Sequence, residues 1–248
     1  MPKVSIITPL YNGTAYVADA IRSVVGQTFT DWEMIIADDG STDHPEPVVA
    51  SAAGGDPRIR LILLARNSGA ASARNAALEL ATGDFIAFLD SDDTWKPEKL
   101  EQQIGFMERN RWAFSFTSYE VMEATGRPAE KIIRAPQRMD YNHYLRNTAI
   151  GCLTVMIDRR LTGPFRMPLL RSSHDMALWL ELMKRGFDAF GIDEILASYR
   201  LVGTSNTANK WKAARDVWKV YRDVERLSLA RSITSFAGYA FHAAAKRL

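Results

Sequence analysis

The chain has 248 residues, of which 47% are hydrophobic and 24% are charged, a composition typical of a folded globular protein. This length is sufficient for one α/β domain with extensions. The formal net charge of +2 gives no general reason to expect a nucleic-acid partner.

Three further features concern the compartment and the membrane. The single cysteine, Cys152, excludes an intramolecular disulfide and fits a reducing environment. A strand is expected within three residues of the first methionine, which leaves no room for a signal peptide. No uninterrupted apolar stretch approaches the ~20 residues that span a bilayer. We therefore expect a soluble or peripheral protein.

The first part of the chain alternates expected strands with expected helices. Apolar runs predict strands at 3–9, 32–37, 59–64 and 85–89. Helical spacing of apolar residues predicts helices at 16–25, 46–53 and 70–81. Strands and helices that alternate at this spacing predict a parallel, doubly wound sheet.

The remainder of the chain is less regular, and we expect it to extend the same sheet. The helices expected here are 96–109, 141–147, 176–185 and a long helical pattern over 210–248. The strands expected are 112–122 and 152–157, followed by one or two strands over 187–190 and 194–200. Residues 126–139 contain two prolines and four positive charges, which favours a flexible loop.

Polar side chains follow the ends of the first-half strands, where a parallel sheet binds its ligands. They are Tyr11, Asp38, Asp39, Arg66, Asn67 and the acidic residues of 90–93. Three carboxylates within 90–93 repel one another unless they are solvated or neutralised, and hard oxygen ligands suit Mg²⁺ or Mn²⁺. The alternative is a solvated acidic turn that caps the next helix. Neither a dinucleotide fingerprint nor a Walker loop is present, so a metal on Asp92 is the candidate for holding phosphates.

Six segments, in this order, resemble the family 2 glycosyltransferases, which have the GT-A fold. They are Val4–Asn12, Asp38–Asp43, Asn67–Asn75, Asp90–Asp93, Asp175–Trp179 and Tyr199–Arg200. The resemblance implies an α/β fold with a mostly parallel central sheet flanked by helices. It places a catalytic domain at 1–205, with a nucleotide-binding half at 1–95 and an acceptor-binding half at 96–205. A basic amphipathic helical extension would follow at 206–248.

The resemblance also implies roles for the donor site of a UDP-sugar. Asp39 would accept the imide N–H of uracil, and Arg74 would reach the base or a diphosphate oxygen. Asp92 would ligate Mn²⁺ or Mg²⁺ on the diphosphate. The remaining implied donor contacts are Thr8, Pro9 and Tyr11 around the base, Asp90 at the ribose, Ser91 beside it, and Arg200 on the phosphates.

Some of these acidic and basic residues have a structural alternative. Asp38 is expected to hold its turn rather than touch substrate, and Arg200 has the alternative of pairing with an acid. Asp43 and Asp93 are candidates for helix caps. Trp179 is expected to pack in the core.

Asp175 matches the family's catalytic carboxylate. It would take the proton of the acceptor hydroxyl in an in-line displacement that inverts the anomeric carbon. The family usually has an acidic residue just before this aspartate, whereas this chain has His174. His174 would orient the acceptor, bind its pyrophosphate, or be an ordinary surface histidine.

The segment 210–248 has nine Lys or Arg against three acids, together with several aromatic residues. This pattern favours contact with an anionic membrane surface. The alternative is that its apolar face packs on the catalytic domain or on a second subunit of a homodimer. Bacterial enzymes that this chain resembles extend glycans on undecaprenyl-diphosphate at the cytoplasmic face of the inner membrane.

The resemblance therefore implies an inverting, metal-dependent transferase that moves a hexose from UDP-glucose or UDP-galactose to a lipid-linked saccharide. The products would be O-antigen, capsule or wall polymers. Two alternatives stay open: transfer to polyprenyl phosphate itself, and a non-catalytic protein that binds nucleotide sugars.

Overall fold

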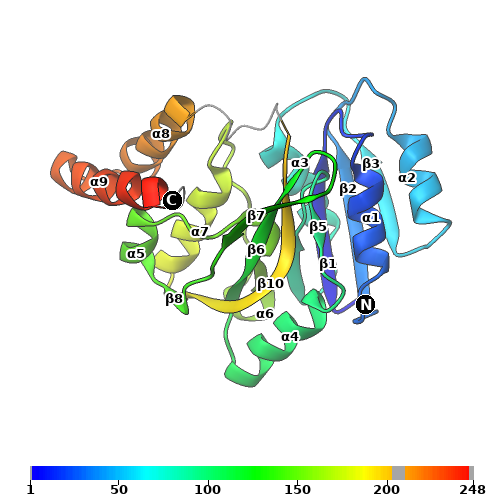
Figure 1. The fold of residues 1–248 in the computed structure, drawn as a ribbon, viewed down its shortest axis with the longest axis horizontal. Helices are drawn as coiled ribbons and strands as arrows, with labels where there is room; N and C mark the ends of the chain where they lie inside the picture. The colour runs from blue at the N-terminus through cyan, green and yellow to red at the C-terminus, as the bar shows by residue number, and fades with distance from the viewer. Residues whose placement is uncertain (1, 203–209, 246–248) are drawn as a thin grey trace.

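The computed structural model describes residues 2–202 and 210–245. In these ranges ten strands form one sheet, with β3-β2-β1-β4-β9-β6-β10-β5 in order, β7 beside β6 and β8 beside β10 (Figure 1). The strands are β1 (Val4–Leu10), β2 (Trp32–Asp38), β3 (Ile59–Leu63), β4 (Phe85–Phe88), β5 (Thr94–Trp95), β6 (Phe114–Glu123), β7 (Pro128–Ile133), β8 (Arg138–Met139), β9 (Met156–Asp158) and β10 (Ala189–Leu201).

Helices cover both faces of this sheet. They are α1 (Val17–Val25), α2 (Glu46–Ala53), α3 (Ala70–Leu80), α4 (Lys99–Asn110), α5 (Tyr141–Arg146), α6 (Arg159–Thr162), α7 (His174–Lys184), α8 (Lys210–Lys219) and α9 (Leu229–Ala245). Short 3₁₀ and π-helical turns lie at Cys152–Thr154 and Val220–Val224. Figure 1 shows α1 and α2 at one end of the molecule and α5, α8 and α9 at the other.

The first half confirms the predicted parallel arrangement. β1 pairs in parallel with β2 on one side and with β4 on the other, so that Val4 lies between Trp32 and Phe85. All residues of β1, β2 and β4 are buried, as expected for strands covered by helices on both faces. Because side chains alternate along a strand, Ile7 packs toward α3 and α7 whereas Ile6 packs toward α1 and α4. The carboxyl ends of these strands consequently meet at one edge.

The second half extends the same sheet, as predicted, but two local expectations are wrong. Residues 126–139 are not a loop, since β7 forms an antiparallel hairpin with β6 that is closed by Glu123 and Arg127. Lys131, one of the charges that favoured a loop, is exposed on this edge strand beside Glu130.

The other difference arises from local hydrogen bonds. The expected strand at 152–157 begins as a 3₁₀ turn, in which the Thr154 hydroxyl donates to the Gly151 carbonyl at 2.7 Å. Of the one or two strands expected over 187–190 and 194–200, the structure has one long strand, β10, whose pairing with β6 is irregular between Ile192 and Ala197.

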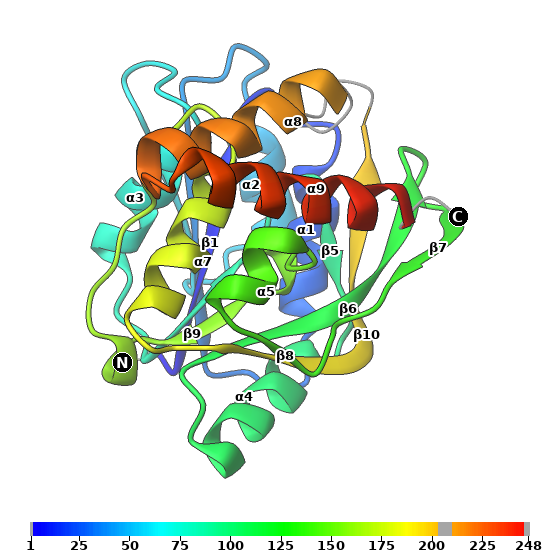
Figure 2. The same cartoon turned by 90° about the vertical axis from the view of Figure 1, so that its left-hand side faces the viewer.

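The C-terminal segment is helical, as predicted, but α8 and α9 are separated by a turn at Arg226, whose φ is +52°. Val217, Tyr221 and Leu227 join the same core cluster as Trp179. The segment therefore packs on the rest of the chain, with α9 crossing in front of α5 in Figure 2. No helix among the described residues has the length and apolar character needed to cross a membrane. The expected domain boundary at 205/206 and the charges of Lys246 and Arg247 lie outside the described residues.

Lys99 is fully buried at the start of α4, where its ammonium contacts Gln103 Oε1 at 2.5 Å and lies 4.4 Å from the centre of the Trp95 ring. No carboxylate forms an ion pair with it in the described part of the chain. Burial disfavours the charged form and lowers the pKa of Lys99 to about 7.

We predict that Lys99 makes the free energy of unfolding rise with pH between about 7 and 9. Over this window the unfolded lysine, with a pKa of roughly 10.4, keeps a proton that the folded one has released, so higher pH favours the folded state. In the variant Lys99→Met this rise should be smaller by about 1–2 kcal/mol, measured by denaturant unfolding at the two pH values. The exposed Lys131→Met is the matched control. An identical pH slope in Lys99→Met and wild type would contradict a neutral buried lysine.

Candidate active site

The turns that follow β1 and β2 are hydrogen-bonded to each other at the carboxyl edge of the sheet. The amide of Asn12 donates to Ser41 Oγ at 2.8 Å, and Asn12 Oδ1 accepts from the Thr42 amide at 2.8 Å. Asp43 accepts from the Thr14 amide at 3.0 Å, so it caps the turn into α1 rather than its own helix. Asn12, in the left-handed region with φ +49°, is a site-building residue to which our sequence analysis assigned no role.

Asp38, the last residue of β2, and Asp39, which follows it, have different roles. Asp38 accepts hydrogen bonds from the amide and hydroxyl of Ser41 and so holds its turn, as expected. Asp39 is buried, and its carboxylate accepts from the amides of Ser68 at 2.9 Å and Gly69 at 2.7 Å. Gly40, which follows Asp39, has φ +71°. A Cβ on Gly40 would lie only 2.9 Å from the backbone of Arg66. The loop before α3 is therefore fixed against Asp39.

The predicted base-contacting residues differ in accessibility. Thr8 and Pro9 are buried within β1, and the Thr8 hydroxyl has no hydrogen-bond partner in the described residues. Tyr11 is 50% exposed, which leaves its ring available for stacking. Ser91 lies close by, since a Cβ on Gly13 would be 3.2 Å from its Oγ. Ser91 thus lies beside the turn that follows Tyr11.

The acidic segment after β4 is held mainly by Arg200. The Arg200 amide donates to Asp93 Oδ1 at 2.8 Å, and its Nε donates to the Asp92 carbonyl at 2.7 Å. The two terminal nitrogens of the guanidinium bond the Ala124 carbonyl at 3.1 Å and Asp19 at 2.9 Å. Arg200 thereby positions the acidic segment, and its contact with donor phosphates stays a prediction.

Burial and mutual repulsion disfavour the charged forms of the carboxylates in this segment. The pKa of Asp92 is raised to about 6 by burial and by the neighbouring Asp90 carboxylate. Burial also raises the pKa of Asp93 well above its usual value, and Asp92 and Asp90 add to this effect. A divalent cation would relieve this repulsion. No cluster of three or more metal-binding side chains occurs in the ranges that the structure describes, and metal binding by Asp92 stays a prediction.

Arg74 and α7 bring the second half of the chain against this edge. Arg74 is buried, donates to Asp90 Oδ1 and contacts His174 Nε2 at 2.5 Å. His174 is only 8% exposed, so the surface-histidine alternative is wrong. Asp175, the next residue, is half-buried and forms no hydrogen bond within the described residues, which leaves its oxygens available.

The helix that presents Asp175 is anchored from its opposite face. Trp179 is fully buried, as expected, with its ring 5.6 Å from that of Phe88 and 5.2 Å from that of Phe114. Because Phe88 ends β4, this packing ties α7 to the strand that delivers the acidic segment. The site thus joins five of the predicted residues, Arg74, Asp90, Asp92, Asp175 and Arg200, within one network of contacts and electrostatic interactions.

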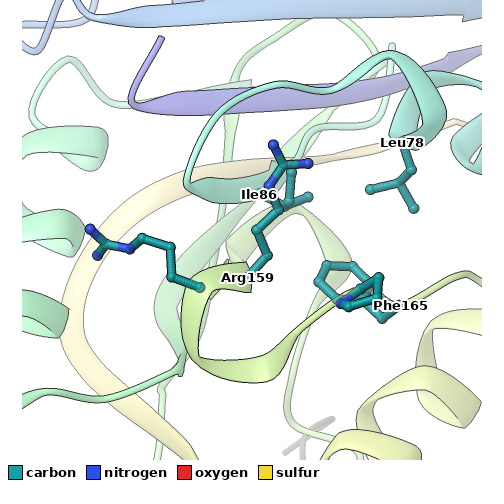
Figure 3. A pocket seen from close by; sticks show the side chains of 6 residues that line it. Leu78, Ile86, Arg159 and Phe165 are labelled. Atoms are coloured by element: carbon teal, nitrogen blue, oxygen red, sulfur yellow. The ribbon is translucent and has the colours of Figure 1, made fainter. Parts of the chain in front are cut away.

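A cavity of about 390 Å³ lies elsewhere, lined by Leu78, Ile86, Arg159, Arg160, Pro164 and Phe165 (Figure 3). Arg159 donates to the Ala81 carbonyl at 2.8 Å, and Arg160 donates to Asp158 at 2.6 Å. Both guanidinium groups are therefore engaged by the protein itself, and none of the strand-end carboxylates lines this cavity.

The family model described as "Glycosyl transferase family 2" matches residues 5–161, which include the strand-end carboxylates. The chain belongs to glycosyltransferase family 2. It is 51% identical over 247 residues to TuaG of Bacillus subtilis, a glycosyltransferase named for teichuronic acid biosynthesis, covering 100% of this chain and 98% of the relative. It is 40% identical over 229 residues to the Escherichia coli protein WfgD, covering 92% and 88%. WfgD is named as a UDP-Glc:α-D-GlcNAc-diphosphoundecaprenol β-1,3-glucosyltransferase.

Solved structures confirm the predicted GT-A fold for this family 2 enzyme. The mannosyltransferase PcManGT of Pyrobaculum calidifontis, in complex with GDP-Man and Mn²⁺, superposes with a TM-score of 0.71 at 18% identity, covering 98% of this chain and 75% of that one. Residues 1–349 of S. aureus TarS, in complex with UDP-GlcNAc, give a TM-score of 0.71 at 18% identity, covering 96% and 71%. At these identities the likeness concerns the fold alone.

We predict that divalent metal and Asp92 together determine UDP affinity. Chelation should weaken UDP binding, and Asp92→Asn should remove the metal dependence. Because a proton competes with the cation on a group whose pKa is about 6, the Mn²⁺-dependent part of the affinity should fall about tenfold from pH 7 to pH 5. Titration calorimetry of UDP with Mn²⁺ or EDTA measures these effects.

The matched control is Asp84→Asn. Asp84 carries a partly exposed carboxylate just before β4, the strand that leads to Asp92. This variant should leave both the metal and the pH dependence intact. Equal UDP affinity in Mn²⁺ and in EDTA would exclude a bridging metal.

Proposed function

We propose that this enzyme is an inverting, metal-dependent hexosyltransferase of cell-surface polysaccharide synthesis. Its donor would be UDP-glucose, with UDP-galactose as the alternative, and its acceptor a saccharide linked to undecaprenyl diphosphate. The 40% identity to WfgD carries the proposal, because it extends over 92% of the chain and so includes the acceptor half as well as the nucleotide half. WfaP of E. coli, named for the same reaction, is 35% identical over 215 residues.

On the donor side, the chain would use the residues gathered at the carboxyl edge of the sheet. Tyr11 offers a stacking face for uracil, with Asp39, Thr8 and Pro9 around the base. Arg74, Asp90 and Ser91 would line the ribose and diphosphate side. Asp92 would hold the cation, which when bound neutralises charge on the leaving diphosphate.

On the acceptor side, Asp175 would act as the general base. Its carboxylate takes the hydroxyl proton while the acceptor oxygen forms the new bond to the anomeric carbon. The bond from that carbon to UDP breaks on the opposite side, which inverts the configuration. A cavity of about 150 Å³ lies beside the loop that precedes α7, between Leu170–Ser172 and residues of α8 and the following turn. Its position supports an acceptor that approaches between α7 and the C-terminal helices.

The C-terminal helices also support a peripheral membrane location, on the cytoplasmic face of the inner membrane. Most of their aromatic and apolar side chains pack inward, but Leu229, Ile233 and Phe241 of α9 are more than half exposed. Basic residues at 219, 222 and 226 are exposed on the adjoining segment. Exposed apolar residues beside basic ones suit an anionic lipid surface.

We predict turnover with UDP-glucose and GlcNAc-diphosphoundecaprenol, and its loss in Asp175→Asn. This variant keeps the shape of the side chain but cannot take a proton, so kcat should fall by roughly 10²–10⁴-fold. UDP affinity should change little, because base and nucleotide site use different residues. UDP release and a UDP titration provide the two readouts.

Glu181→Gln, farther along the same helix, is the matched control and should retain turnover. The same assay with polyprenyl phosphate as acceptor tests the polyprenyl-phosphate sugar synthase alternative. If no acceptor is glycosylated while UDP-sugar binds, the non-catalytic alternative holds instead. Near-normal turnover in Asp175→Asn would remove this residue from the base role.

We predict that the full chain binds vesicles containing anionic lipid, and that Ile233→Glu and Phe241→Glu each reduce this binding severalfold. High salt should weaken the binding by screening. Leu63→Glu, an equally exposed apolar residue on β3, is the control. Sedimentation with vesicles measures bound protein. If the wild-type protein does not bind anionic vesicles at low salt, the exposed residues of α9 face solvent or form a dimer interface. Sedimentation velocity distinguishes these two cases by the mass of the protein in solution.

A further inference from the structure

His174 is a buried residue between the two halves of the site, and the family comparison assigns it no role. It is the first residue of α7, and its side chain turns inward while the adjacent Asp175 stays half-exposed. Ser173, immediately before it, has φ +56°, a conformation that non-glycine residues rarely adopt. Backbone strain therefore occurs at the residue just before His174, which is buried, and Asp175, which is half-exposed.

The partner of His174 is the guanidinium of Arg74. The Arg74 side chain is 5% exposed, and its two terminal nitrogens bond Asp90 and His174. Arginine is always charged and donates only, so His174 Nε2 must accept and the imidazole is neutral, with its proton on Nδ1. Burial and the Arg74 charge lower the pKa of His174, which agrees with the neutral form. His174 therefore offers Arg74 an acceptor, not a proton.

This contact completes a continuous chain from the donor site to the catalytic helix. Asp90 follows β4, Arg74 lies on α3, and His174 begins α7. Arg74 Nε has no hydrogen-bond partner in the described residues, so its contacts with Asp90 and His174 determine where the guanidinium lies. Without His174, a second nitrogen of a buried cation would lose its partner, which is costly.

We propose that His174 is a positioning residue: through Arg74 it fixes the first turn of α7, and with it Asp175, relative to Asp90 at the donor site. Transfer requires the acceptor oxygen, its base and the anomeric carbon to be aligned at the same time, and small displacements of such groups reduce rates steeply. The contact between His174 and Arg74 fixes the distance between Asp175 on α7 and Asp90 at the donor site. This inference rests on the proposed function, since it assigns His174 a part in the same transfer.

The test compares His174→Gln with His174→Asn. Both replacements are neutral amides, but the Gln side chain carries its oxygen close to the place of Nε2, whereas the shorter Asn side chain carries it close to Nδ1. His174→Gln can therefore still accept from Arg74, and His174→Asn cannot. We expect His174→Gln to keep kcat within about threefold of wild type and His174→Asn to lose about 10–100-fold. UDP affinity should change much less than kcat in both, because Asp90 still binds the other terminal nitrogen of Arg74.

A merely structural role would lower folded yield and unfolding midpoint without this split between kcat and UDP affinity. Thermal unfolding of each variant is therefore measured alongside, and His143→Asn, at an exposed position of α5, is the control that should change neither quantity. If His174→Gln is as inactive as His174→Asn although both bind UDP, His174 transfers a proton or contacts substrate, and the positioning role is overturned. Equal, near-normal kcat in both variants overturns it as well.

Failure of the proposed function can be recognised separately. If wild type does not glycosylate the lipid-linked acceptor, the function as proposed has failed, whatever the variants do. The slow hydrolysis of UDP-glucose, in which water replaces the acceptor hydroxyl, then gives the same comparison of kcat between His174→Gln and His174→Asn. A lower hydrolysis kcat in His174→Asn than in His174→Gln supports the positioning role. Equal values in the two variants overturn it.

Discussion

The concentration of carboxylates after β4 is the constraint on which the site depends. Asp90, Asp92 and Asp93 lie within four residues, and burial raises the pKa of Asp92 and Asp93 because their charged forms are poorly solvated. Left alone, such a segment would move outward into water. Arg200 prevents this through its amide and guanidinium, which bind Asp93 and the Asp92 carbonyl at the same time. The negative charge is thereby retained where a cation and a diphosphate can use it.

The same constraint explains the composition of the surrounding elements. The strand that delivers the acids, β4, is entirely apolar and lies between β1 and β9, so its end cannot shift. Trp179 packs α7 against Phe88 at this end of β4, and Arg74 contacts Asp90 from α3. Charged groups with little solvation are thus surrounded by rigid apolar packing, which is the usual arrangement of a preorganised active site.

The C-terminal helices belong to this arrangement rather than forming a separate appendage. Tyr221 is fully buried and donates to the Leu145 carbonyl of α5, and Glu225 accepts from Tyr141 at 2.6 Å and Lys184 at 3.0 Å. Ser172, three residues before Asp175, donates to Asp216 of α8 at 2.6 Å. Contacts made by the last forty residues therefore reach the loop that precedes α7. An acceptor or surface that moved α8 would act on Asp175 through this loop.

The sequence by itself determined the parallel first half and which polar residues meet at its carboxyl edge. Buried strands read as continuous apolar runs, and acids at their ends must share one edge when the strands are parallel, so Asp39 and Asp90–Asp93 could be placed together without coordinates. Local patterns also identified α7 and the core position of Trp179. Tertiary structure alone decided that β7 is a strand, since its polar sequence is stabilised by pairing with β6. It alone decided that Arg200 holds the acidic segment and that His174 faces inward to Arg74, because those contacts join residues 107 and 100 positions apart in the chain. Periodicity and local propensity report each residue's own neighbours, whereas the partner of a buried charge depends on which distant segments the folded core brings together.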